Sequence, residues 1–122
     1  MENKNLELAL NQRSEAQVLS PTQTQVATLR QELSLLIREQ VNAHCIDERE
    51  ALLLSLRLGL LDGTCATLQK IGEMLNISPE WVRQRQYFLL KKKITDPHFF
   101  ARLKEYSRLF HLPRGIRSQE DR

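Results

Sequence analysis

The stretch that decides the fold is residues 67–93, which read TLQKIGEMLNISPEWVRQRQYFLLKKK. Thr67 can cap a short helix at its start, and Asn76 suits the end of that helix. Ser78 and Pro79 then supply a second start, because a capping hydroxyl is followed by a proline at the first helical position. The stretch therefore predicts two short helices joined by a tight turn.

A glycine inside the first of these helices indicates how the two helices pack. Gly72 costs a helix about 1 kcal/mol relative to alanine, so its presence predicts close approach of the neighbouring helix. Ile77 in the turn and Val82 in the second helix can fill the angle between the two helices. Two helices arranged in this way form a helix-turn-helix, in which the second helix is offered to DNA.

The chain on either side of this stretch also favours helices. Glycine and proline number only four each, and no segment alternates apolar and polar residues as a strand would, so we predict an all-α fold. Ser20 and Gln23 form a capping-box pattern around Pro21, and Asp47 and Glu50 repeat it, so each pattern predicts the start of a helix. The helix from Pro21 carries an apolar stripe for a core or a partner, namely Val26, Leu29, Leu33, Leu36, Ile37 and Val41.

The breaks between these patterns divide the chain into three parts. Residues 1–19 are polar and have no sustained period, which predicts a flexible N-terminal arm. Residues 20–112 are expected to form one helical domain with the helix-turn-helix at residues 67–93, and residues 113–122 to form a flexible tail. The length of 122 residues is enough for one domain with one core.

Composition argues against several classes of protein. The longest apolar run, residues 51–54, is far shorter than the roughly 20 residues of a membrane span, and the first 20 residues mix charges with amides, unlike a signal peptide. The only two cysteines, Cys45 and Cys65, lack a Cys-x-x-Cys spacing, which favours reduced thiols over a disulfide or a metal site. We therefore expect a cytoplasmic protein without membrane contact, metal or cofactor.

Charge is distributed unevenly along the chain. Residues 68–108 carry nine Lys and Arg against four Asp and Glu, whereas residues 1–67 carry six against nine. A surface that meets phosphates has such a concentration, although a solvated helix face has it too. The three histidines are isolated, and neither a glycine-rich phosphate loop nor a Ser/His/Asp set can be identified, so we predict a protein that is not an enzyme.

Several blocks of the sequence, in a fixed order, resemble the sigma-seventy class of bacterial sigma factors. The similar region of that family is the C-terminal region 4, which recognises the minus-35 promoter element. The resemblance extends from Leu29 to Lys104 and is carried by residues 47–53, 56–60, 67–72, 77–84 and 90–92. It implies a region 4-like helix-turn-helix fold with an additional N-terminal helix.

The resemblance also implies where ligands bind. It places Glu80, Arg83 and Gln84 where the family contacts bases and phosphates of promoter DNA, and the first two helices where the family binds the flap of the RNA polymerase β subunit. The predicted DNA-binding residues are Ser78, Glu80, Arg83, Gln84, Gln86, Lys91, Lys92 and Lys93.

Four apolar residues are candidates for contact with a protein. Trp81 and Phe88 stand seven residues apart on one helix face, at positions that are usually charged in the family. They either pack against another helix or form a protein-binding patch, and Arg85 lies between them in place of a usual aliphatic residue. Leu33 and Ile37, from the stripe of the first helix, are predicted protein contacts as well.

Three functional hypotheses follow from these patterns. The leading one is a bacterial transcription regulator that binds promoter DNA, RNA polymerase or both during initiation. The second is an adaptor that mimics sigma region 4, occupies the polymerase flap or another partner, and never recognises DNA bases. The third is a homodimeric repressor of the tryptophan-repressor kind.

Overall fold

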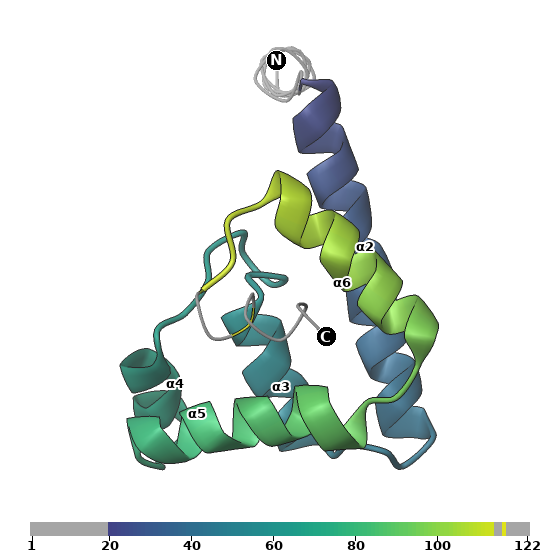
Figure 1. Ribbon diagram of the computed structural model, residues 1–122. Coiled ribbons are helices and arrows are strands. Elements are labelled where there is room, and N and C mark those ends of the chain that lie inside the picture. The colour runs from purple at the N-terminus through teal and green to yellow at the C-terminus, as the bar shows by residue number, and fades with distance from the viewer. Residues whose placement is uncertain (1–19, 114–115, 117–122) are drawn as a thin grey trace, which may run out of the picture.

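The secondary structure is entirely helical in residues 20–113 and 116, the residues that the computed structural model describes (Figure 1). The elements are α2 (Pro21–Asn42), α3 (Glu48–Arg57), α4 (Leu68–Leu75), α5 (Pro79–Phe88), a π-helical turn η1 (Leu89–Lys93) that extends α5, and α6 (Pro97–Leu109). The prediction of an all-α fold is confirmed. None of the helices in this part of the chain is long and apolar enough to cross a membrane.

The helices begin where the capping patterns predict. Both capping boxes form: the Gln23 amide donates to Ser20 Oγ at 3.2 Å, and the Glu50 amide donates to Asp47 Oδ1 at 2.8 Å. The Thr67 hydroxyl caps α4 in the same way. Each contact satisfies an amide that the first turn of a helix leaves without a partner, and this fixes the residue at which the helix starts.

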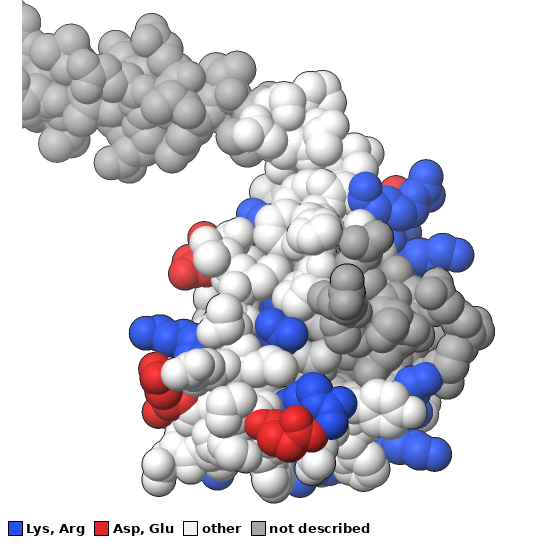
Figure 2. Space-filling model, turned by 60° about the vertical axis from the view of Figure 1, so that its left-hand side comes forward, with Lys and Arg blue, Asp and Glu red and all other residues white. Residues whose placement is uncertain are grey.

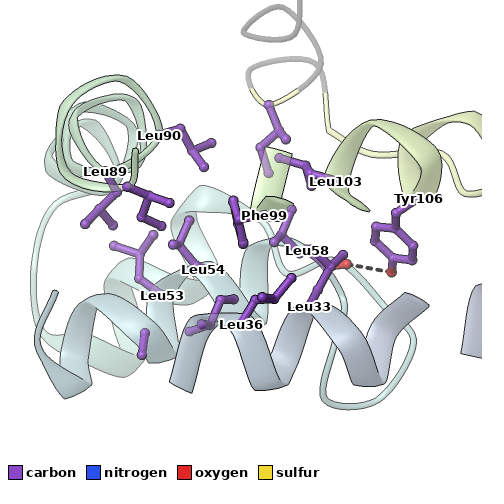
Figure 3. Close-up of a cluster of buried hydrophobic side chains, with 14 of the residues drawn as sticks. Leu33, Leu36, Leu53, Leu54, Leu58, Leu89, Leu90, Phe99, Leu103 and Tyr106 are labelled. Carbon is purple, nitrogen blue, oxygen red and sulfur yellow. Dashed lines mark hydrogen bonds between the residues drawn. The ribbon is translucent and has the colours of Figure 1, made fainter. Parts of the chain in front are cut away.

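The helices enclose one core, to which α2 contributes the longest apolar stripe. In Figure 1, α2 and α6 lie side by side, while α5 runs beneath α3 with α4 at its end. Figure 3 shows Leu33 and Leu36 of α2 directed towards side chains of α3 and α6. Leu33 and Ile37 are 0% and 2% exposed, so their prediction as protein contacts is wrong. They contact the rest of the same fold because α6 covers the stripe.

The core extends beyond α6. Leu112 and Ile116 are both fully buried, and the Ile116 amide donates to the Pro113 carbonyl at 3.1 Å. Ile116 falls in the segment 113–122 that the sequence predicted as a flexible tail, so apolar packing continues past the predicted boundary. The predicted arm, residues 1–19, lies outside the described residues.

One buried tyrosine, Tyr106, connects α6 to α2 and to the residue that follows α3. Tyr106 of α6 donates its hydroxyl to the carbonyl of Leu58, just after α3, at 2.8 Å (Figure 3). The same oxygen accepts from Arg30 Nε of α2 at 3.0 Å. Its ring stacks on Phe110, with the ring centroids 5.0 Å apart. Burial raises the pKa of the Tyr106 hydroxyl, so the neutral form that donates to Leu58 is favoured.

This contact yields a prediction about stability. Tyr106→Phe keeps the ring but leaves the Leu58 carbonyl without its donor, and an unsatisfied buried polar group costs about 1–3 kcal/mol. Urea unfolding should show that decrease in the free energy of unfolding. Tyr87→Phe is the matched control, because Tyr87 is exposed and should tolerate loss of its hydroxyl. Equal stability of the two variants would contradict a structural role for the Tyr106 hydroxyl.

Candidate nucleic-acid interface

The two helices of the predicted helix-turn-helix, α4 and α5, pack directly against each other. Asn76 closes α4 in the left-handed conformation, with φ 60° and ψ 48°, a conformation that asparagine adopts more readily than most residues. The Ile77 amide then donates to the Gly72 carbonyl at 2.9 Å, which brings the turn against α4. A Cβ atom at residue 72 would lie 2.5 Å from the Ile77 carbonyl oxygen. A close approach at Gly72 is confirmed, but its nearest neighbour is the backbone of the turn at Ile77 and not the body of the next helix.

One face of α5 is buried and therefore cannot meet DNA. Val82 is fully buried, and Gln86, one turn later, is 2% exposed. Gln86 Oε1 accepts from Arg57 Nε at 2.6 Å, and the same guanidinium donates to the Ala66 carbonyl at 3.0 Å. Gln86 thus connects α5 to α3, and its prediction as a DNA contact is wrong, because a residue four positions after Val82 shares its face. Burial lowers the pKa of Arg57.

The opposite face of α5 is exposed and holds four of the predicted DNA contacts, namely Ser78, Glu80, Arg83 and Gln84. The Ser78 hydroxyl caps the helix, accepting from the Trp81 amide at 3.1 Å. The other three side chains form a polar cluster in which Glu80 accepts from both neighbours. Its Oε1 lies 3.1 Å from Arg83 Nε, its Oε2 also accepts from Arg83 Nη2, and Gln84 Nε2 lies 3.4 Å from Oε2.

The pairing of Glu80 with Arg83 determines how this face presents charge. The hydrogen bonds from Arg83 hold the pKa of the Glu80 carboxyl below its ordinary value, and the same contact raises the pKa of Arg83. Both groups are therefore charged near neutral pH, and each compensates the other. Any base or phosphate that binds the Arg83 guanidinium must compete with Glu80 or bind alongside it.

The three lysines that follow α5 lie in different environments. The π-helical turn η1 closes with a hydrogen bond of 2.9 Å from the Ile94 amide to the Leu89 carbonyl. Lys91 Nζ lies 5.3 Å from the centroid of the Tyr87 ring, and Lys92 is exposed. Lys93 Nζ lies 3.6 Å from a carboxylate oxygen of Glu50, so it joins η1 to α3. Because Lys93 is paired with Glu50, Lys91 and Lys92 are the two of these lysines that are available to contact phosphates.

A buried carboxylate, that of Glu50, lies behind α5, and the sequence pattern indicated it only as part of a capping box. Glu50 accepts from the Asp47 amide at 2.9 Å, and its side chain is almost completely buried. Its second oxygen lies 3.3 Å from Arg85 Nη1, and Lys93 is the third neighbour. Glu50 therefore anchors the last turn of α5, through Arg85, and η1, through Lys93, to the start of α3.

Arg85 also lies against the two aromatic residues that the sequence singled out. Its Cζ is 4.4 Å from the centroid of the Trp81 ring and 5.5 Å from that of Phe88, distances at which a cation is attracted to a ring face. Trp81 is 43% exposed and Phe88 41%, so neither is covered by another helix. These three residues and Gln84 line a shallow hollow on the surface of α5. Packing of the two aromatics against another described helix is therefore contradicted, and their binding to a protein stays a prediction.

The surface charge is mixed. On the face shown in Figure 2, the blue Lys and Arg side chains are separated by uncharged surface, and red carboxylates lie among them. A ligand on such a surface would meet individual cations, so the position of each cation matters more than a general basic field. The described residues include no group of three or more His, Cys, Asp or Glu placed to hold a metal ion.

Comparison with known proteins identifies the motif. Residues 44–92 match the family model described as Sigma-70, region 4. Over 75 residues the chain is 37% identical to the RNA polymerase sigma factor SigA1 of Synechococcus elongatus (strain ATCC 33912 / PCC 7942 / FACHB-805), and this alignment covers 60% of the chain and 18% of that protein. No solved structure matches the chain.

The fold and the matched segment together define a sigma-70 region 4 domain. The resemblance inferred from the sequence is therefore confirmed for residues 44–92, which match this domain and contain the helix-turn-helix of α4 and α5. A domain of this class indicates a DNA-binding or RNA polymerase-interacting role in transcription. Helices α2 and α6, which pack against each other, lie outside the residues matched by the family model.

Proposed function

We propose that this chain is a DNA-binding regulator that recognises a promoter element like the minus-35 element and acts with RNA polymerase in transcription initiation. The observation that carries this proposal is the division of α5 into two faces. Glu80, Arg83 and Gln84 are exposed on one face, while Val82 and Gln86 on the other are buried. In a helix-turn-helix, the exposed residues near the start of the second helix are those that enter the major groove.

The three exposed side chains have the chemistry that base edges require. An arginine donates two hydrogen bonds to guanine, a glutamine pairs with adenine, and a glutamate accepts from the amino group of cytosine. In the free protein Arg83 is held by Glu80. We expect DNA to take over part of that contact, so that Glu80 both orients the guanidinium and restricts which bases it can bind.

A pull-down with core RNA polymerase, performed with and without a promoter duplex, tests this function most directly. Regulation at the promoter requires that the chain is retained together with the duplex, and that the chain also binds a labelled duplex in the absence of polymerase. Retention on the polymerase with no measurable DNA binding under any salt condition would remove the DNA-binding function.

DNA binding should also depend on salt through particular lysines. Each phosphate contact that is lost flattens the slope of log affinity against log salt concentration by about one unit. Replacing Lys91 and Lys92 together with glutamine is therefore expected to flatten the slope by about two units. Lys93→Gln is the matched control and should leave the slope unchanged, because Lys93 is paired with Glu50. An unchanged slope after replacement of Lys91 and Lys92 would place the phosphate contacts elsewhere, and a slope flattened by Lys93→Gln would contradict its pairing with Glu50.

A second function is favoured by one specific observation, the exposure of Trp81 and Phe88. Exposed aromatic residues are enriched where proteins contact each other. In this alternative the chain is an adaptor that presents a sigma-like surface to the polymerase β flap, or to another protein, without recognising bases. Loss of polymerase retention in Trp81→Ala, with DNA binding absent from the parent as well, would support the adaptor.

A further inference from the structure

Trp81 lies inside the segment of α5 that the proposed function directs into the major groove. It comes directly after Glu80 in the first turn of the helix, and its ring is partly exposed. Gln84 belongs to the polar cluster around Glu80 and also lines the hollow beside the Trp81 ring. The ring and the polar base-contacting residues therefore share one continuous surface.

The ring is held in place before any ligand binds. The Arg85 guanidinium lies 4.4 Å from its centroid, and that guanidinium is fixed in turn by Glu50, 3.3 Å away on α3. The Trp81 amide is itself the donor to the Ser78 cap, so the backbone at this residue is fixed as well. A side chain restrained in this way loses little conformational entropy when a ligand covers it.

We propose that Trp81 is a specificity-determining residue that contacts the C5-methyl group of thymine in the major groove, an inference that rests on the proposed function. The face of an indole ring offers no hydrogen bond to a base edge, but it gains from contact with an apolar group. Thymine is the base that presents such a group in the major groove, next to the hydrogen-bonding atoms of its neighbours. Arg83 and Lys92, exposed on the same element or just after it, are cations that suit DNA rather than an apolar protein groove.

The test removes single methyl groups from DNA. A randomised duplex library is selected for binding to the full chain, and the enriched duplex is then synthesised with uracil in place of each thymine in turn. Uracil keeps every hydrogen-bonding atom and lacks only the methyl group. One substitution is expected to raise the Kd of the parent protein about fourfold, the effect of one buried methylene-sized group. Trp81→Ala should bind the two duplexes equally.

Two further measurements keep the inference separable from a general loss of binding. Phe88→Ala is the control variant, since it removes the other exposed aromatic of the hollow but should keep the preference for thymine. The chain contains one tryptophan, so its fluorescence reports on Trp81 alone. Emission should shift to shorter wavelength on binding the thymine duplex, and by less on binding the uracil duplex.

The outcomes separate failure of the inferred role of Trp81 from failure of the proposed DNA-binding function. Tight binding of the parent to both duplexes with equal affinity would overturn the role of Trp81 and leave DNA recognition standing. Failure to enrich any duplex would overturn both. Release of core RNA polymerase by Trp81→Ala, with unchanged preference for thymine, would assign the ring to a protein partner and likewise overturn the inference.

Discussion

Gly72→Leu is expected to lower the free energy of unfolding by about 3 kcal/mol or more, the upper end of the usual cost of overpacking. The first atom of the new side chain would already lie 2.5 Å from the Ile77 carbonyl oxygen and 3.3 Å from the Pro79 nitrogen. Both of these are backbone atoms, so a change of rotamer cannot relieve the clash. Small domains have a total stability of roughly 5–15 kcal/mol, and the variant should therefore melt far below the parent.

Two companion variants separate the clash from helix propensity. Gly72→Ala adds only the Cβ atom, and we expect it to be destabilising even though alanine is favoured over glycine by about 1 kcal/mol inside a helix. Glu73→Ala changes the exposed neighbouring position and should leave the melting temperature close to that of the parent. If Gly72→Leu melts together with the parent, α4 does not approach the turn as closely as described, and the position of α5 is in doubt as well.

The starts of the helices could be predicted from sequence because the information is local. Ser20 with Gln23, Asp47 with Glu50, and Ser78 with Pro79 each act within three residues of the chain. A capping side chain satisfies the first amides of its own helix whatever the rest of the fold does. The close approach at Gly72 was predictable for a similar reason, since glycine inside an otherwise regular helix indicates a backbone neighbour.

The environment of each helix face was less predictable. Periodicity shows that Leu33 and Ile37 share a stripe, but it does not show that α6, which begins 60 residues after Ile37 at Pro97, covers that stripe. The prediction for Gln86 failed in the same direction, because its polar side chain suggested a ligand contact at a position that is buried. Its spacing of four residues from Val82 was the available signal, and it favours the buried face.

The contacts of Glu50 could not have been predicted from the sequence. Arg85, its partner in α5, is 35 residues away in the chain, and the local pattern explains Glu50 completely as a capping residue. The departure of Arg85 from the family pattern was visible, but its meaning depends on α3 lying behind α5. Lys93, the other ion-pair partner of Glu50, is likewise far from it in the chain.

The largest effect on function is expected from Arg83→Ala. An arginine that binds guanine through two hydrogen bonds discriminates against other bases by about 1–3 kcal/mol, which is about fivefold to 150-fold in affinity. The variant should therefore lose most of its preference for a selected duplex over a scrambled one, as measured by fluorescence anisotropy. Its binding to core RNA polymerase should persist, because Arg83 is exposed and is not part of the hydrophobic core of this chain.

A matched control separates base recognition from the loss of one positive charge. Arg38→Ala also removes an exposed arginine from an ion pair, in this case with Glu48 at 2.7 Å, but Arg38 lies on α2. It should weaken binding to both duplexes slightly and equally, and so leave the ratio of affinities unchanged. Equal changes of that ratio in the two variants would show that Arg83 contributes charge alone.

The same experiment distinguishes regulator from adaptor through Glu80. In a DNA-binding protein, Glu80→Gln frees the Arg83 guanidinium from its ionic partner and should strengthen binding to all duplexes while weakening discrimination among them. In an adaptor that does not recognise bases, neither Glu80→Gln nor Arg83→Ala alters any DNA preference, and Trp81→Ala releases the protein partner. Circular dichroism must first show that each variant remains folded. A folded Arg83→Ala variant that retains full preference for the selected duplex would exclude the exposed face of α5 as the base-recognising surface.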